Sequence, residues 1–229
     1  LAGGRYRPLS LITFAIEQQF FGTGHHGATR HAKEQRMANE MHARHVLNVF
    51  LYLVAVIVLL YFLRRVIFPG DPVPAFIAAL IFTILPVHSE VVANVKSRDE
   101  ILSLLFISAT FIKAFRYYDS KKKADLVWTL LCYFLALLSK EYAVTLRILL
   151  PVSIYIFRNE PGKSALRFAI PFLAPLAVYL LLRLSAVTGM AEGAERNIMN
   201  NPYLLATVAQ RLASELLVLL LYLKLLVFP

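Results

Sequence analysis

The segment 86–100, PVHSEVVANVKSRDE, places charged side chains between two apolar runs. The charged side chains of this segment are Glu90, Lys96, Arg98, Asp99 and Glu100. Carboxylates can take a proton from a reacting hydroxyl, and a lysine can bind a phosphate as a point charge. The segment is therefore either an ordinary solvated loop or a polar surface beside a membrane where chemistry occurs.

Two of these acids have a structural explanation that needs no substrate. Ser97 and Glu100 have the spacing of a capping box, in which each side chain satisfies a backbone amide at the start of a helix. Asp99 and Glu100 would also lie favourably at the positive end of that helix. We therefore predict that a helix begins at Ser97.

Residues Glu90, Asn94 and Arg98 are four apart, so a continuous helix would carry an acid, an amide and a cation on one face. The alternative is a solvated loop helix without a ligand. His88 has no second ligand at a zinc-site interval, so we predict no metal site and no cofactor. The histidines of residues 25–45 are interpreted as part of a solvated, charged stretch.

A second polar cluster follows at Ser139-Lys140-Glu141, and Arg147 lies two turns inside an apolar run. An isolated cation in such a run usually faces the bundle interior or a water-filled cavity. We predict one anion-binding site formed by the cations Lys96, Arg98, Lys140, Arg147 and Arg183. The candidate general acids or bases are Glu90, Asp99, Glu100 and Glu141.

The elements that hold these side chains are expected to be membrane helices. The 229 residues are 59% hydrophobic, with a mean hydropathy of +0.63, well above the usual apolar share of soluble domains. The net charge of +10 comes from cations beside apolar runs, a pattern typical of membrane topology rather than of nucleic-acid binding. The sequence therefore predicts an all-α, polytopic membrane protein.

We expect about seven spans of roughly 20 residues each, with a tight hairpin between the fourth and the fifth. They are placed near 46–63, 75–93, 101–117, 126–142, 143–158, 167–185 and 204–226. Residues 1–45 form a separate juxtamembrane segment with an amphipathic helix in 10–21, and 46–229 form the membrane domain. Loops rich in lysine and arginine are expected in the cytoplasm, so 86–100 and 139–142 are expected on the outer face.

Several strings occur in an order that resembles a known family. They are Tyr6-Arg7-Pro8-Leu9, Pro86–Asn94, Ser97–Glu100, Leu138–Glu141, Asn201-Pro202 and Tyr222–Pro229. The chain is similar to the membrane part of the transmembrane and tetratricopeptide repeat-containing family, in its bacterial form. Those proteins belong with the O-mannosyltransferase-like GT-C glycosyltransferases.

The resemblance implies inverting transfer of a sugar from a polyprenyl-phosphate donor to a protein or another acceptor on the outer face of a bacterial inner membrane. It places the family's first span and first acidic outer loop before Leu1 and its tetratricopeptide repeats after Pro229. The usual catalytic acid is therefore expected outside this chain. The alternative is a transporter or scaffold for lipid-linked sugars. A transporter would carry polar residues along a midplane path, whereas the ionisable residues here gather mainly on one face.

Overall fold

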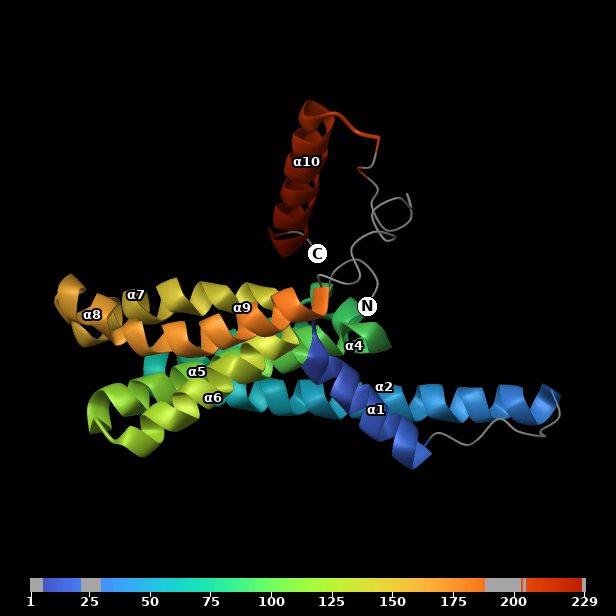
Figure 1. Ribbon diagram of the computed structural model, residues 1–229, viewed down its shortest axis with the longest axis horizontal. Helices are drawn as coiled ribbons and strands as arrows, with labels where there is room; N and C mark the ends of the chain where they lie inside the picture. Colours follow the sequence, from blue (N-terminus) through green and yellow to red (C-terminus); the bar gives the residue numbers. More distant parts are fainter. Residues whose placement is uncertain (1–5, 22–29, 188–202, 204, 228–229) are drawn as a thin grey trace.

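The computed structural model describes residues 6–21, 30–187, 203 and 205–227 (Figure 1). The described residues form helices and turns, without a β-strand. The α-helices are α1 (Pro8–Phe21), α2 (Arg30–Phe62), α3 (Pro72–Ile84), α4 (Val87–Ala93), α5 (Arg98–Ser120), α6 (Lys123–Ser139), α7 (Leu146–Arg158), α8 (Gly162–Phe168), α9 (Leu173–Val187) and α10 (Val208–Val227). A π-helical stretch, Leu63–Ile67, extends α2, and short 3-10 turns precede α5, α7 and α9.

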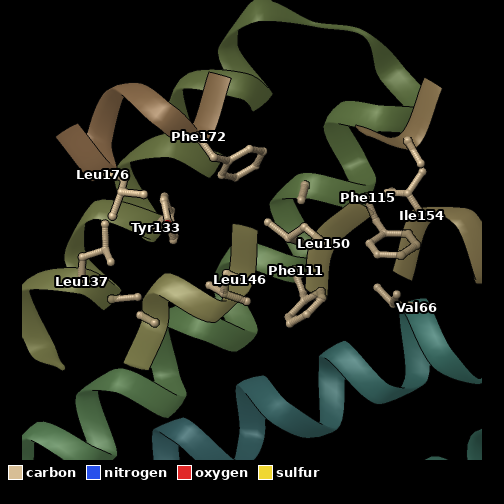
Figure 2. Packing of buried hydrophobic residues seen from close by; sticks show 14 of the residues in the cluster. Val66, Phe111, Phe115, Tyr133, Leu137, Leu146, Leu150, Ile154, Phe172 and Leu176 are labelled. Carbon is tan, nitrogen blue, oxygen red and sulfur yellow. The ribbon is translucent and has the colours of Figure 1, made fainter. Parts of the chain in front are cut away.

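The centre of the fold is the antiparallel pair α5 and α6. Helix α5 packs along α6 on one side and along α2 on the other, and α9 packs against α6. The buried apolar residues gather between α5, α6, α7 and α9 (Figure 2). Those labelled there are Val66, Phe111, Phe115, Tyr133, Leu137, Leu146, Leu150, Ile154, Phe172 and Leu176.

Local sequence explains where several of these helices begin and end. The Asp71 carboxylate accepts a hydrogen bond of 2.9 Å from the amide of Val73, with Pro72 at the first helical position of α3. Helices α5 and α7 both end in a left-handed residue, Lys121 at φ 55° and Asn159 at φ 51°. A left-handed residue after the last turn is a common way to stop a helix.

Most large apolar side chains on α3, α7, α9 and α10 are exposed, and those on α2 are exposed or partly exposed. Within the helical stretch Ala38–Ile67, the most apolar window has a mean hydropathy of 2.8, and only 11% of that window is buried. A water-soluble protein rarely exposes apolar surface on this scale, whereas a bilayer covers such helices. The architecture is therefore that of an all-α membrane protein.

The structure does not support seven spans. Three described helical stretches are long and apolar enough to cross a membrane, Ala38–Ile67, Val95–Ser120 and Gly162–Ala186. Helices α3 and α4, bent by 66° at Leu85-Pro86, would make a fourth if they form one span. Helices α6 and α7 have 17 and 13 residues, fewer than the roughly 20 that a span needs, and α10 includes Arg211, Glu215 and Lys224.

Other predicted features agree with the structure. The predicted amphipathic segment is helix α1, and the predicted break between the fourth and fifth segments lies between α6 and α7, at residues 140–145. The charged stretch before the first span continues into it as the single helix α2, which runs across residues 45 and 46 without interruption. Residues 22–29, between α1 and α2, lie outside the described residues.

The bundle has two distinct ends (Figure 1). The α5–α6 turn and α8 lie at one end, where the sequence has Lys121, Lys122, Lys123 and Lys163. Helix α4 and the start of α1 lie toward the other end. The chain therefore separates the lysine-rich loops from the segment that includes residues 86–97.

Candidate functional site

The start of α1 meets the start of α5 and the end of α6 in a cluster of charged side chains. The Arg7 guanidinium forms an ion pair with Asp99. It also donates to both oxygens of Glu141, at 3.1 Å from Nε and 3.0 Å from Nη2. Such a two-pronged arrangement fixes the relative orientation of a guanidinium and a carboxylate. One arginine therefore holds two of the predicted acids together.

A second pair completes this group of residues. Lys140 Nζ forms an ion pair with Glu100, and the Tyr142 hydroxyl donates to the other Glu100 oxygen at 3.0 Å. The Lys140 ammonium also lies 5.2 Å from the centre of the Tyr142 ring. We call this set the Arg7 cluster; its members are Arg7, Asp99, Glu100, Lys140, Glu141 and Tyr142.

Electrostatics keep the Glu141 carboxyl ionised. Its partial burial, the largest single effect, raises its pKa, whereas hydrogen bonds from Arg7 and from its own backbone amide lower it. The charges of Arg7 and Arg183 lower the pKa of Glu141 further, so that the net shift is downward. A carboxylate with a lowered pKa is a weaker base, which suits Glu141 for holding a cation rather than for taking a proton.

Arg98 lies apart from this cluster, in the protein interior. Its side chain is 0% exposed, and its Nη2 lies 2.8 Å from Oε1 of Glu17, which is 6% exposed. Its Nε donates to Oδ1 of Asn48 at 2.8 Å, and its guanidinium lies 4.3 Å from the ring centre of Phe14. Arg98 therefore joins α1, α2 and α5, and its predicted role in binding phosphate would require these contacts to break.

Two sequence interpretations around residue 97 are wrong. The Ser97 side chain makes no capping hydrogen bond; the Asp99 carboxylate accepts from the Glu100 amide at 2.9 Å, and Glu100 is engaged by Lys140. The proposed common face of Glu90, Asn94 and Arg98 does not exist, because α4 ends at Ala93 and a turn precedes α5. Glu90 is exposed whereas Arg98 is buried.

The other predicted cations have different surroundings. Lys96 is exposed on the turn before α5. Arg183, near the end of α9, lies close enough to Glu141 for its charge to affect the pKa of that acid. Arg147 is exposed in the first turn of α7 and lines an apolar cavity of about 720 Å³ between α7 and the α8–α9 region. Within the described residues, Arg147 has no acidic partner.

The described histidines form no metal site. The ring Nδ1 of His88 lies 2.6 Å from the Phe82 carbonyl, and the His88 ring packs 4.1 Å from the Phe82 ring. His42 contacts the Ala38 carbonyl one turn away on α2. Groups of three possible metal-binding side chains do not occur in the part of the chain that the structure describes. The side chains of residues 25, 26 and 31 lie outside that part.

Sequence reasoning missed Arg7, Tyr142 and Glu17 as site residues. Arg7 precedes the first residue of α1, Pro8, and a cation at the positive end of a helix is unfavourable unless acids compensate it. The position of Arg7 before a helix could therefore have indicated that acidic side chains pair with it. Glu17 pairs with Arg98, and Tyr142 with Glu100, across long stretches of the sequence. No spacing pattern in the sequence indicates either pair.

Comparisons with known proteins agree with the membrane architecture. Residues 37–187 match the family described as dolichyl-phosphate-mannose-protein mannosyltransferase. Protein O-mannosyl-transferase TMTC4 of Homo sapiens is 32% identical over 161 residues, covering 61% of this chain and 19% of that protein. Protein O-mannosyl-transferase TMTC3 of Mus musculus is 31% identical over 149 residues, covering 61% and 14%. The chain thus spans less than a fifth of these relatives, and no solved structure matches it.

Proposed function

This chain belongs to the dolichyl-phosphate-mannose-protein mannosyltransferase family, and we propose that it transfers a sugar from a polyprenyl-phosphate donor to a protein acceptor on the outer face of a membrane. The membership and the O-mannosyl-transferase relatives support the reaction class. The proposal extends to a bacterial inner membrane and to tetratricopeptide repeats elsewhere in the protein, on the resemblance stated above.

The reaction needs two kinds of assistance. The acceptor hydroxyl oxygen attacks the anomeric carbon of the sugar while the bond from that carbon to the phosphate oxygen breaks, with inversion. The departing polyprenyl phosphate keeps the electron pair, so cations must stabilise its developing charge. A carboxylate takes the proton of the acceptor hydroxyl.

Arg147 carries the assignment of the donor site. It is exposed, lacks an acidic partner among the described residues, and lies at an apolar cavity. A polyprenyl phosphate combines an anionic group with a long hydrocarbon chain. We propose that Arg147 contacts the phosphate and that the cavity holds the first part of the chain.

Lys140 and Arg183 are the further cations of this proposed site. Glu100 holds the Lys140 ammonium, which has three N–H donors, so Lys140 can keep its carboxylate partner and still donate to a phosphate oxygen. Arg183 lies close enough to Glu141 for its charge to lower the pKa of that acid. Exposed Lys96 stays in the proposal as a peripheral cation.

The four predicted acids differ in whether a cation already neutralises them, and this decides which can act as a base. Asp99, Glu100 and Glu141 are each paired with a cation, and we propose that they position Arg7 and Lys140. Glu90 is exposed, and within the described residues its carboxylate has no hydrogen-bond or ion-pair partner. Of the four, Glu90 is therefore our candidate for proton transfer.

Transfer from a labelled polyprenyl-phosphate mannose to a peptide acceptor tests the proposal, with the full protein in liposomes. A charge-assisted contact contributes roughly 1.5–3 kcal/mol, so Arg147→Gln should lower transfer about tenfold or more. Because Arg147 is exposed, its replacement should leave the melting temperature unchanged. Lys122→Gln, at the other end of the bundle, is the matched control and should transfer normally. Normal transfer by Arg147→Gln would contradict the donor site.

A further inference from the structure

A second cavity lies at the lysine-rich end of the bundle, away from the Arg7 cluster. It measures about 690 Å³ and opens between α2 with its π-helical extension, α5 and α7. We call it the basic cavity, because four of its lining residues are cations: Arg65, Lys113, Arg116 and Arg158. The acid that lines it is Asp119.

Two of the four cations are neutralised by acids. Arg158 donates from Nε and Nη2 to the two oxygens of Asp119 at 2.9 and 2.7 Å. Arg116 Nε lies 3.1 Å from Oδ1 of buried Asp125. The hydrogen bonds to Asp119 raise the pKa of Arg158 above its ordinary value. These pairs connect α5 to α6 and α7 and leave little charge for a ligand.

The other two cations are not neutralised. Within the described residues, neither Arg65 nor Lys113 has an acidic partner. The Arg65 guanidinium is held 5.5 Å from the centre of the Tyr61 ring, which also lines the cavity. The basic cavity therefore presents two uncompensated charges, one of them oriented by an aromatic ring.

Position in the fold accounts for the sign of these charges but not for the cavity. Arg65 lies in the last turn of the π-helical extension, where a cation is favourable because the carboxyl end of a helix is partly negative, and the cytoplasmic side of membrane proteins accumulates lysine and arginine. Neither effect requires Arg65 and Lys113, from different helices, to line one hollow. Arg65 lies in the last turn of the candidate span Ala38–Ile67, and Lys113 lies about two turns before the end of the candidate span Val95–Ser120.

We propose that the basic cavity binds the phosphate of an anionic phospholipid. Val66, Ile112 and Phe115 supply an apolar wall beside the cations, which suits a ligand that joins a phosphate to hydrocarbon. Basic pockets between membrane helices are known to take such headgroups. Its two uncompensated cations come from other helices than the donor cavity, which is lined by α7 and the α8–α9 region, and they lie toward the opposite end of the bundle from Arg147. Its occupation does not depend on sugar transfer.

Lipid binding to the full protein in detergent tests the inference, by native mass spectrometry with phosphatidylglycerol, phosphatidylcholine and soluble glycerol phosphate as three separate probes. Each membrane-surface cation contributes about fivefold to the affinity for anionic lipid. The double variant Arg65→Gln/Lys113→Gln should therefore bind phosphatidylglycerol about 25-fold more weakly. The control Arg64→Gln/Lys163→Gln removes two cations of the same end that do not line the cavity, and should bind like the original protein.

The three probes separate the outcomes. Preference for phosphatidylglycerol over phosphatidylcholine, lost in the Arg65/Lys113 double variant but kept in the control, supports the site. Equal binding of the two lipids would overturn it, as would equal losses in both double variants. Glycerol phosphate that binds as tightly as phosphatidylglycerol would overturn the assignment to a lipid. Melting temperatures without added lipid distinguish loss of the site from loss of the fold.

Discussion

Replacing Arg98 by glutamine should destabilise the protein strongly. Its guanidinium is fully buried between α1, α2 and α5, where it meets Glu17 at 2.8 Å and Asn48 at 2.8 Å. Glutamine is too short and carries no charge, so the Glu17 carboxylate would stay buried without a counter-ion. The expected effect is therefore the cost of an uncompensated charge in addition to the loss of the hydrogen bonds.

The magnitude follows from the burial of both partners. Removing one member of a buried ion pair typically costs 3–5 kcal/mol, and Glu17 is only 6% exposed. A change of 1 kcal/mol shifts the melting temperature of a chain of this size by about 2–4 °C. Arg98→Gln should thus lower the melting temperature by about 6–20 °C.

Thermal unfolding in detergent, followed by far-ultraviolet circular dichroism, measures this effect. Lys96→Gln is the matched control, since that side chain is exposed two residues away and should change the melting temperature little. The double variant Arg98→Met/Glu17→Met removes both charges together and should recover much of the loss, because apolar residues of similar volume often replace a buried ion pair at little cost.

Two results would refute this reasoning. If Arg98→Gln has the same melting temperature as the original protein, the buried pair does not hold α1 to α2 and α5. If the double methionine variant is less stable than Arg98→Gln, the cost does not come from an unpaired Glu17 carboxylate. Either result would return Arg98 to the set of cations available for a phosphate.

Three further predictions concern other parts of the chain. Ser97→Ala should change the free energy of unfolding by less than about 0.5 kcal/mol, because its side chain does not cap α5; a loss of about 1 kcal/mol, the usual value for a cap, would contradict the structure. Glu141 has a lowered pKa in the folded protein, so its ionised form stabilises the fold above its unfolded pKa of about 4.3, and this contribution disappears as the pH falls through the folded pKa. The melting temperature should therefore fall more steeply below about pH 4 in the original protein than in Glu141→Gln, and parallel curves would count against the pairing. With Cys132 replaced by alanine, a cysteine at Ser89 should react with an impermeant thiol reagent in intact cells and one at Ser120 should not, because the lysine-rich loops are expected in the cytoplasm; the reverse labelling would invert the orientation.

The sequence predicted the structural class and many of the helices, because both depend on local composition. Apolar runs too long for a soluble domain indicated membrane helices. The break near Lys140 and the helix of residues 10–21 were also predicted from the sequence, since polar residues interrupt the apolar run near Lys140 and polar residues alternate with apolar ones in 10–21. Length and hydropathy did not fix the number of spans, because the segments on either side of Lys140 form helices α6 and α7 of 17 and 13 residues, fewer than the roughly 20 that a span needs.

The polar residues of interest were found by their type, but their assignments depended on contacts between distant segments. Asp99, Glu100, Lys140 and Glu141 do lie in one cluster. The same reasoning grouped Arg98 with them, although the chain turns at Asn94–Ser97 and directs Arg98 into the interior. Adjacent residues on a helix point in different directions, about 100° apart, so neighbours in sequence can belong to different environments.

Sequence alone therefore determined that this protein is helical, apolar and charged at the loops, since composition and periodicity act within a few residues of chain. Only the tertiary structure decided which charges are neutralised and which are left for a ligand. Arg7 meets an acid 134 residues away, and Arg98 meets Asn48 at a separation of 50. Such pairings arise when helices pack against one another, and the energy of each depends on the burial that packing creates.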